Sequence, residues 1–144
     1  MTEVSYKALF DLSGRCAVVT GGAGYLGEGF CHGYAEFGAK VAVVDIDGKK
    51  AEVLAEGLRR RYGVAAMGVA CDVSDPEQVQ AMVDRVVEAL GGIDILHNNA
   101  ANQSRGLKAQ FAPFEDYDLE DWRRVMSVDV EGMFLVAQAV GRQM

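Results

Sequence analysis

Short apolar runs alternate with longer segments of helical periodicity along this chain, and this alternation constrains the fold more than any other feature. The apolar runs cover residues 16–20, 40–45, 64–72 and 93–97 and are rich in Val, Ile, Leu and Ala. Such runs predict parallel strands buried on both faces, and the helical segments between them predict βαβ units. We therefore expect a doubly wound parallel α/β sheet whose four strands are all interior or nearly so.

The first two helical segments follow the first two apolar runs. The first covers about residues 25–37 and ends at Gly38, and the second follows Asp47 and stops at Gly63. The apolar positions expected to be buried are Leu26, Phe30, Tyr34 and Phe37 in the first helix, and Ala51, Leu54, Ala55, Leu58 and Tyr62 in the second.

The third and last helical segments begin at recognisable polar residues. Ser74 with Glu77 three residues later predicts a capping box, and Pro76 suits the first helical turn. The last helix is expected to begin after Asp118 and to run toward Gln143, with apolar residues almost all round its second half. The connection before it, residues 101–118, has the length of a functional or mobile loop.

Composition excludes several classes of protein. The chain has 144 residues, the size of one domain, and a formal net charge of −7, so a nucleic acid would be repelled. No segment is apolar for long enough to span a membrane, and no secretory leader is recognisable. Cys16, Cys31 and Cys71 show neither a disulfide framework nor metal spacing, so we expect no metal, buried free thiols and a cytoplasmic protein.

The segment Thr20–Gly27 carries the first chemical signal. It follows the first apolar run, opens the first helix and contains GxGxxG as Gly22, Gly24 and Gly27. Glycines here let a pyrophosphate approach the backbone, and the helix N-terminus supplies free N–H groups. The alternative is a glycine-rich turn that binds nothing. The context favours a dinucleotide site in a Rossmann-like sheet of strand order 3-2-1-4.

Asp45 ends the second apolar run, 18 positions beyond Gly27. A carboxylate at this place can accept hydrogen bonds from both ribose hydroxyls of an adenosine, although it could instead cap the next helix. A 2′-phosphate about 4 Å away would cost about 4 kcal/mol per charge pair at an effective dielectric of 20. Because no Lys or Arg lies between Thr20 and Lys40, and Ile46 follows the acid, the sequence favours NAD over NADP.

Taken in series, four motifs resemble those of the short-chain dehydrogenase/reductase family, over essentially the whole chain. Residues 20–27 are similar to its TGxxxGxG loop, and Asp72-Val73 to its adenine-contacting pair. Residues 98–101, NNAA, resemble its NNAG, and residues 122–134 resemble the helix that carries its VNxxG. The resemblance implies that Asp72 and Val73 flank the adenine.

The same resemblance implies that Asn99 and Ala100 line the cofactor cleft, and that Asn98 and Asn99 tie the fourth strand to its neighbours. For single motifs the alternatives are ordinary turn residues and, for Asp72, a helix cap. The cofactor-binding residues that we predict are Gly21, Gly22, Gly24, Tyr25, Leu26, Gly27, Asp45, Ile46, Asp72, Val73, Asn99 and Ala100.

Three departures from the family pattern bear on function. Tyr25 replaces the middle glycine of the loop, which gives the spacing of the extended epimerase and dehydratase branch, whereas NNAA favours the shorter dehydrogenase branch. Asp129 stands where the family has a catalytic asparagine, and the resemblance implies that the backbone carbonyl at this position holds a relay water. Finally, no tyrosine is followed by lysine at the YxxxK spacing of the family's general acid.

We therefore expect residues 1–144 to be the dinucleotide-binding part of an NAD-dependent oxidoreductase that acts on a small alcohol or carbonyl substrate, truncated before its later strands and inactive alone. The alternatives are a non-catalytic NAD-binding or regulatory module, an extended-branch epimerase or dehydratase fragment, and a purely structural or interaction fragment. Since the fourth strand would be an exposed edge, we expect association with a second copy or with a C-terminal piece.

Overall fold

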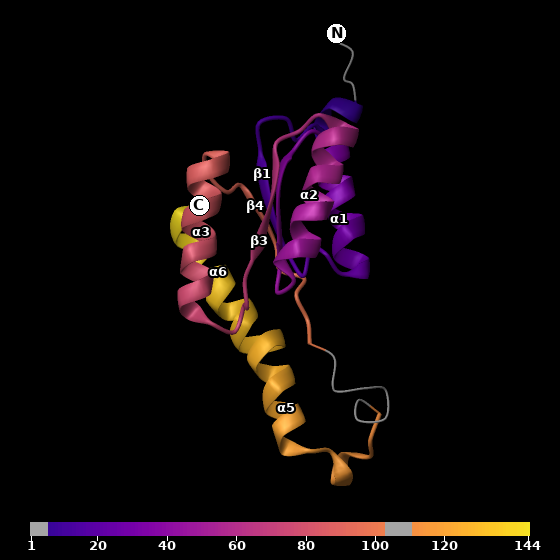
Figure 1. Ribbon diagram of the computed structural model, residues 1–144, viewed down its shortest axis with the longest axis vertical. Coiled ribbons are helices and arrows are strands. Elements are labelled where there is room, and N and C mark those ends of the chain that lie inside the picture. Colours follow the sequence, from indigo (N-terminus) through magenta and orange to yellow (C-terminus); the bar gives the residue numbers. More distant parts are fainter. Residues whose placement is uncertain (1–5, 103–110) are drawn as a thin grey trace.

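The computed structural model describes residues 6–102 and 111–144 and contains a four-stranded parallel sheet (Figure 1). The strands are β1 (Cys16–Thr20), β2 (Lys40–Asp45), β3 (Ala66–Ala70) and β4 (Ile95–His97). They lie in the order β3-β2-β1-β4, and β1 pairs with both β2 and β4. The predicted α/β class and strand order 3-2-1-4 are confirmed.

Helices cover both faces of the sheet. On one face lie α1 (Tyr25–Glu36) and α2 (Gly48–Tyr62), and on the other lie α3 (Pro76–Leu90) and α6 (Met133–Gln143) (Figure 1). Each pair of helices closes its own hydrophobic core against alternate residues of the central strands. Val18 and Val44 face α3 and α6, whereas Val19 and Val43 face α1 and α2.

The expectation that all four strands are interior is wrong for β3 and β4. All of β1 and the central residues of β2 are buried, whereas β3 has mixed burial and β4 is half-buried throughout. These two strands form the edges of the sheet. They are also shorter than predicted, because flanking apolar residues such as Ile93 are buried without being part of a strand.

The predicted buried face of α1 is also wrong, except for Tyr34, which is partly buried against the core. Its buried residues are Gly27, Cys31 and Ala35, whereas 64% of Leu26 and 37% of Phe30 are exposed. Small side chains face inward because α1 lies too close to the sheet for larger ones. Phe37 caps the C-terminus of the helix, half-exposed, and Gly38 follows it in the left-handed region at φ 90°.

α2 follows the prediction. Asp47 caps its N-terminus by accepting a hydrogen bond from the Lys50 backbone N–H, and Gly63 ends it in the left-handed region at φ 69°. Ala51, Ala55 and Leu58 are buried. The helix therefore starts and stops where its sequence signals predict.

The N-terminus of α3 differs from the predicted capping box. Asp75 is the cap, and its carboxylate accepts hydrogen bonds from the backbone N–H groups of Glu77 and Gln78. Ser74 instead donates to Asp72 Oδ1 at 2.6 Å. Because Pro76 is the first helical residue, the residue directly before it occupies the capping position. Val79, Met82, Val83, Val86 and Leu90 form the buried face of the helix.

The last predicted helix consists of three segments. α5 (Leu119–Met126) leads into a π-helical segment, Ser127–Gly132, and then into α6. In Figure 1, α5 extends away from the sheet, whereas α6 runs beside α3. Only Gly132, Val136 and Val140 of the stretch from Leu119 to Gln143 are buried. Residues 103–110 of the predicted loop lie outside the described residues.

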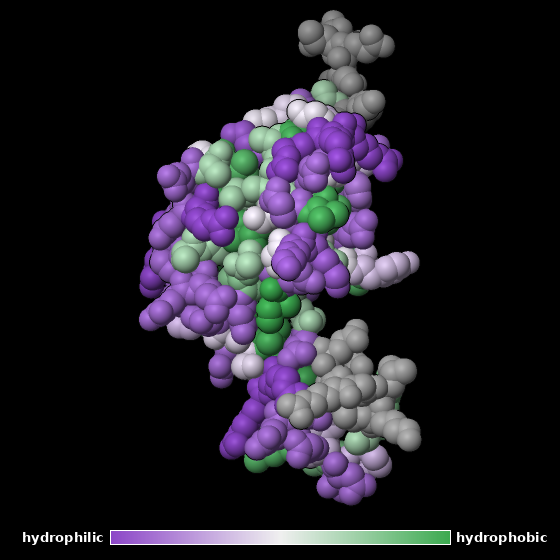
Figure 2. Space-filling view, in the orientation of Figure 1, coloured by the Kyte–Doolittle hydropathy of each residue, from purple (hydrophilic) through white to green (hydrophobic). Residues whose placement is uncertain are grey.

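None of the helices in residues 6–102 and 111–144 is both long and apolar enough to cross a membrane. The surface in Figure 2 is mostly hydrophilic, with hydrophobic side chains visible at the level where α6 begins. Phe134, the second residue of α6, is 62% exposed. The apolar half of the last helix therefore has a buried face against α3 and a second face at the surface.

The capping assignment predicts that Asp75→Ala lowers the melting temperature more than Ser74→Ala, as measured by circular dichroism. Hydrogen bonds from Gln78 and Glu77 hold the pKa of Asp75 below its ordinary value of 3.8. This stabilisation is present above the ordinary pKa and is lost as the pH falls through the lowered one. The gap between Asp75→Ala and the unaltered chain should thus close in acid; a larger effect of Ser74→Ala would restore Ser74 as the cap.

Candidate functional site

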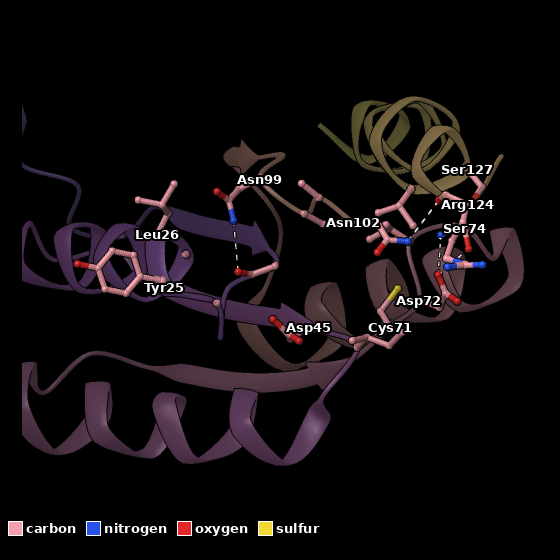
Figure 3. A pocket seen from close by; sticks show the side chains of 18 residues that line it. Tyr25, Leu26, Asp45, Cys71, Asp72, Ser74, Asn99, Asn102, Arg124 and Ser127 are labelled. Atoms are coloured by element: carbon pink, nitrogen blue, oxygen red, sulfur yellow. Dashed lines mark hydrogen bonds between the residues drawn. The ribbon is translucent and has the colours of Figure 1, made fainter. Parts of the chain in front are cut away.

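A cleft of about 790 Å³ lies outside the carboxyl ends of the strands (Figure 3). The turns after β1, β2, β3 and β4 form one side, and the end of α5 with the start of the π-helical segment forms the other. Its lining residues are Gly21, Gly24, Tyr25, Leu26, Gly27, Asp45, Ile46, Cys71, Asp72, Val73, Ser74, Asn99, Ala100, Ala101, Asn102, Arg124, Ser127 and Val128. All the predicted cofactor-binding residues except Gly22 are among them.

The turn after β1 is fastened to the segment after β4. The Thr20 hydroxyl, fully buried, accepts hydrogen bonds from the backbone N–H groups of Asn99 and Ala100, each at 3.0 Å, and donates to Asn98 Oδ1. In return the Asn99 side-chain amide donates to the carbonyls of Thr20 and Gly21. These bonds hold two walls of the cleft in a fixed relation.

Glycines in this turn allow close contacts between backbones. A Cβ on Gly27 would collide with the carbonyl of Gly21, and a Cβ on Gly22 would lie 2.8 Å from the carbonyl of Val19. Gly22 is buried and donates its N–H to the Val44 carbonyl, so it shapes the turn from below the cleft. Gly21 has φ 60°, which a residue with a side chain rarely adopts.

The N-terminus of α1 is suited to an anion. Its N-cap is Gly24, which has no side chain to satisfy the first N–H groups of the helix. Gly24, Tyr25, Leu26 and Gly27 all line the cleft at this point. Free N–H groups together with the positive end of the helix dipole form a place where a phosphate group can bind.

Asp45 is held rigidly at the end of β2. Its Oδ2 accepts from the Ala23 N–H and its Oδ1 from the Asp47 N–H, each at 3.0 Å. Each carboxylate oxygen has a second lone pair for a further donor. The alternative that Asp45 merely caps the next helix is wrong, because Asp47 caps α2. Ile46 beside it is 75% exposed.

Asp72 and Val73 follow β3 at the next wall. Asp72 Oδ1 accepts from the backbone and the hydroxyl of Ser74, and it is not a helix cap, because Asp75 has that role. Val73 is buried, and its side chain lies where a Cβ on Gly132 would collide with it. The π-helical segment therefore packs directly on the turn after β3.

Asp129 lies within the π-helical segment and does not line the cleft. Its Oδ1 accepts from the Asn102 backbone N–H at 2.7 Å, and the Asn102 side chain donates to the Arg124 carbonyl at 3.3 Å. π-Helical turns are frequent at functional sites because they disturb the regular bonding of carbonyl groups. The observed contact of Asp129 is with the segment after β4, which it anchors.

Several residues that line the cleft were not predicted from the sequence. Cys71, Ser74, Ala101 and Asn102 are neighbours of predicted residues and could have been found by extending each motif by one or two positions. Arg124, Ser127 and Val128 lie within residues 122–134, which resemble the family's VNxxG helix, but that resemblance gave a role only to Asp129. No group of three or more His, Cys, Asp and Glu side chains that could hold a metal occurs in the described ranges.

The Cys71 thiol is a poor nucleophile despite its place in the cleft. Burial raises its pKa to about 11, and the nearby carboxylates of Asp72 and Asp75 act in the same direction. The thiol is therefore neutral at physiological pH. It contributes a small apolar wall to the cleft, and it is free, as are Cys16 and Cys31.

This fold and cleft define a doubly wound, Rossmann-like α/β protein, and comparison with known sequences identifies its family. The family model described as short chain dehydrogenase matches residues 15–144, so the chain belongs to that family. It is 41% identical over 142 residues to D-threitol dehydrogenase of Mycolicibacterium smegmatis, covering 99% of this chain and 52% of that protein. Gluconate 5-dehydrogenase of Gluconobacter oxydans is 37% identical, with 98% and 52% covered.

Solved structures agree with this family. NAD+-bound xylitol dehydrogenase superposes with a TM-score of 0.85 at 38% identity, covering 92% of this chain and 49% of that one. NADPH-dependent 3-quinuclidinone reductase from Rhodotorula rubra superposes with a TM-score of 0.86 at 26% identity, with 99% and 52% covered. The chain thus spans about half the length of each of these four relatives.

The glycine contacts predict opposite effects for two substitutions in α1. Gly27→Ala should lower the free energy of unfolding by about 1–3 kcal/mol, because the added methyl meets backbone. Gly29→Ala meets nothing within 4 Å and should raise it by up to about 1 kcal/mol through helix propensity. Urea denaturation measures both. Equal stability of the two variants would contradict the close approach of α1 to the turn.

Proposed function

We propose that this chain is the dinucleotide-binding portion of an oxidoreductase that transfers hydride between NAD and a small alcohol or carbonyl compound. The observation that carries the proposal is the Asp45 carboxylate, held by two backbone N–H groups at the edge of the cleft beside the N-terminus of α1. When bound, NAD supplies the hydride acceptor. The residues of this chain that line the cleft bind and orient the cofactor.

Each wall of the cleft has a role in this proposal. The N–H groups at the start of α1 hold the pyrophosphate, and Asp45 accepts hydrogen bonds from the adenosine ribose. Asp72 and Val73 flank the adenine, while Asn99 and Ala100 line the cleft near the ends of β1 and β4. Gly21, Gly22, Gly24, Tyr25, Leu26, Gly27 and Ile46 complete the proposed cofactor site.

The charge around Asp45 supports NAD rather than NADP. A 2′-phosphate would face the carboxylate, and Ile46 offers no positive charge to offset it. Lys49 and Lys50, which follow on α2, do not line this cleft but a groove between α1 and α2. Lys50 is moreover paired with Asp47 at 3.6 Å.

For the substrate we propose a polyol or a related sugar acid. Of the four relatives named above, three are by their names dehydrogenases of threitol, gluconate and xylitol, and the fourth reduces 3-quinuclidinone. No tyrosine in this sequence has the YxxxK spacing of the family's general acid. We therefore also propose that the chain alone does not catalyse the reaction. Of the family's catalytic residues it would supply only Asp129, at the position of the asparagine.

Cofactor choice can be tested by isothermal titration calorimetry with NAD+ and NADP+. The unaltered chain should bind NAD+ at least tenfold more tightly, because a charge pair at about 4 Å outweighs the 1.4 kcal/mol that a tenfold ratio represents. Asp45→Ala should weaken NAD+ about tenfold or more by removing hydrogen bonds to a charged group, and Asp45→Ala with Ile46→Arg should favour NADP+.

Asp47→Ala is the matched control for this experiment. Asp47 is also a carboxylate in the same turn, but it caps α2 and does not line the cleft. The control should reduce thermal stability and leave the NAD+ to NADP+ ratio unchanged. Tighter binding of NADP+ to the unaltered chain would overturn the ribose assignment.

The proposal also includes association with a second copy or with a C-terminal piece. In the described part of the chain β4 pairs only with β1, and Val130, Met133 and Phe134 are exposed along the last helix. Open strand edges and apolar faces favour association. The free, buried state of the three cysteines supports a reducing, cytoplasmic compartment.

Light scattering of the purified chain measures this association. The expected mass exceeds 15.5 kDa at micromolar concentration and decreases when Phe134 is replaced by a charged residue. Val53→Glu on α2 is the control, because Val53 is also exposed but lies on the opposite face of the sheet. A monodisperse monomer at all concentrations would contradict the proposal.

A further inference from the structure

Arg124 carries the one positive charge among the cleft residues within 6–102 and 111–144. The other charged side chains that line the cleft are the carboxylates of Asp45 and Asp72. Figure 3 shows Arg124 beside Ser74 and Asp72, at the end of the cleft away from Tyr25 and Leu26. The cation therefore lies at the end of the cleft formed by the turn after β3.

Both the side chain and the backbone of Arg124 are held in place. Its Nη1 donates to Asp121 Oδ1 at 2.8 Å, and the two side chains are only 31% and 14% exposed. Its carbonyl accepts from the side chains of Asn102 and Ser127. A guanidinium fixed in this way loses little conformational freedom when a ligand binds against it.

One nitrogen of the guanidinium is engaged with Asp121, and the residue lines the cleft. Guanidinium groups stack on aromatic rings, and the adenine of a dinucleotide is such a ring. Asp72, on the neighbouring wall, offers carboxylate oxygen to an exocyclic amine. A planar cation and a carboxylate on adjoining walls suit an aminopurine, whose ring can stack on the first and whose amine can donate to the second.

We propose that Arg124 is a binding residue for the adenine ring, which its guanidinium covers at the outer end of the cleft. The inference rests on the proposed function, because it assumes that a dinucleotide occupies the cleft. It adds a contact from α5, a helix that the glycine loop and the Asp45 position do not involve. The adenine is then enclosed by two elements that lie about fifty residues apart in the sequence.

The test compares fragments of the cofactor by isothermal titration calorimetry, with AMP, nicotinamide mononucleotide and NAD+ as probes. Arg124→Ala should weaken AMP and NAD+ by the same factor, about tenfold, and leave nicotinamide mononucleotide unchanged. Arg124→Lys keeps the charge but not the plane, so it should restore little of the loss. Circular dichroism of each variant checks that it is folded.

Arg123→Ala is the matched control. Arg123 precedes Arg124 on the same helix, is exposed and does not line the cleft. Equal affinities of the Arg123 and Arg124 variants for AMP would overturn the inference while NAD+ binding still supports the proposed function. Equal weakening of nicotinamide mononucleotide, or full rescue by lysine, would also overturn adenine stacking. Absence of NAD+ binding to the unaltered chain would refute the dinucleotide site itself.

Discussion

The contact between the start of α1 and the turn after β1 is the constraint on which the rest of the structure depends. Gly27 lies so close to the Gly21 carbonyl that no side chain fits between them. This contact brings α1 down on β1, selects Cys31 and Ala35 for its inner face and leaves Leu26 and Phe30 outside. It also directs the first N–H groups of α1 into the cleft.

Four aspartates show that the position of a carboxylate decides whether it caps a helix or lines the cleft. Asp47 and Asp75 each lie directly before a helix and satisfy its first N–H groups. Asp45 and Asp72 each lie a little earlier, at a strand end or in the turn after it, and line the cleft. In the turns after β2 and β3 alike, one carboxylate caps the next helix and a different one lines the cleft.

The sequence predicts the sheet, its order and most of the cleft, because these depend on strong local signals. Buried strands, glycine turns and residues at strand ends are recognisable without tertiary contacts. The prediction for the inner face of α1 is wrong because hydrophobicity favours large side chains there. The tight backbone contact at the start of the helix requires small ones. Asp75 was missed because two capping candidates are adjacent, and only the position of Pro76 in the folded helix decides between them.

The length of the π-helical segment fixes how the cleft-facing side of α5 is oriented relative to the core-facing side of α6. A π-helical turn holds about one residue more than an α-helical turn, so it rotates the next helix, α6, by about 100° around the axis. With this offset Arg124 and Ser127 face the cleft, while Val136 and Val140 face the core. Loss of one residue between Ser127 and Gly132 would put the two surfaces out of phase. The length of this segment therefore matters as much to the fold as the absence of a side chain at Gly132, which allows it to pack on Val73.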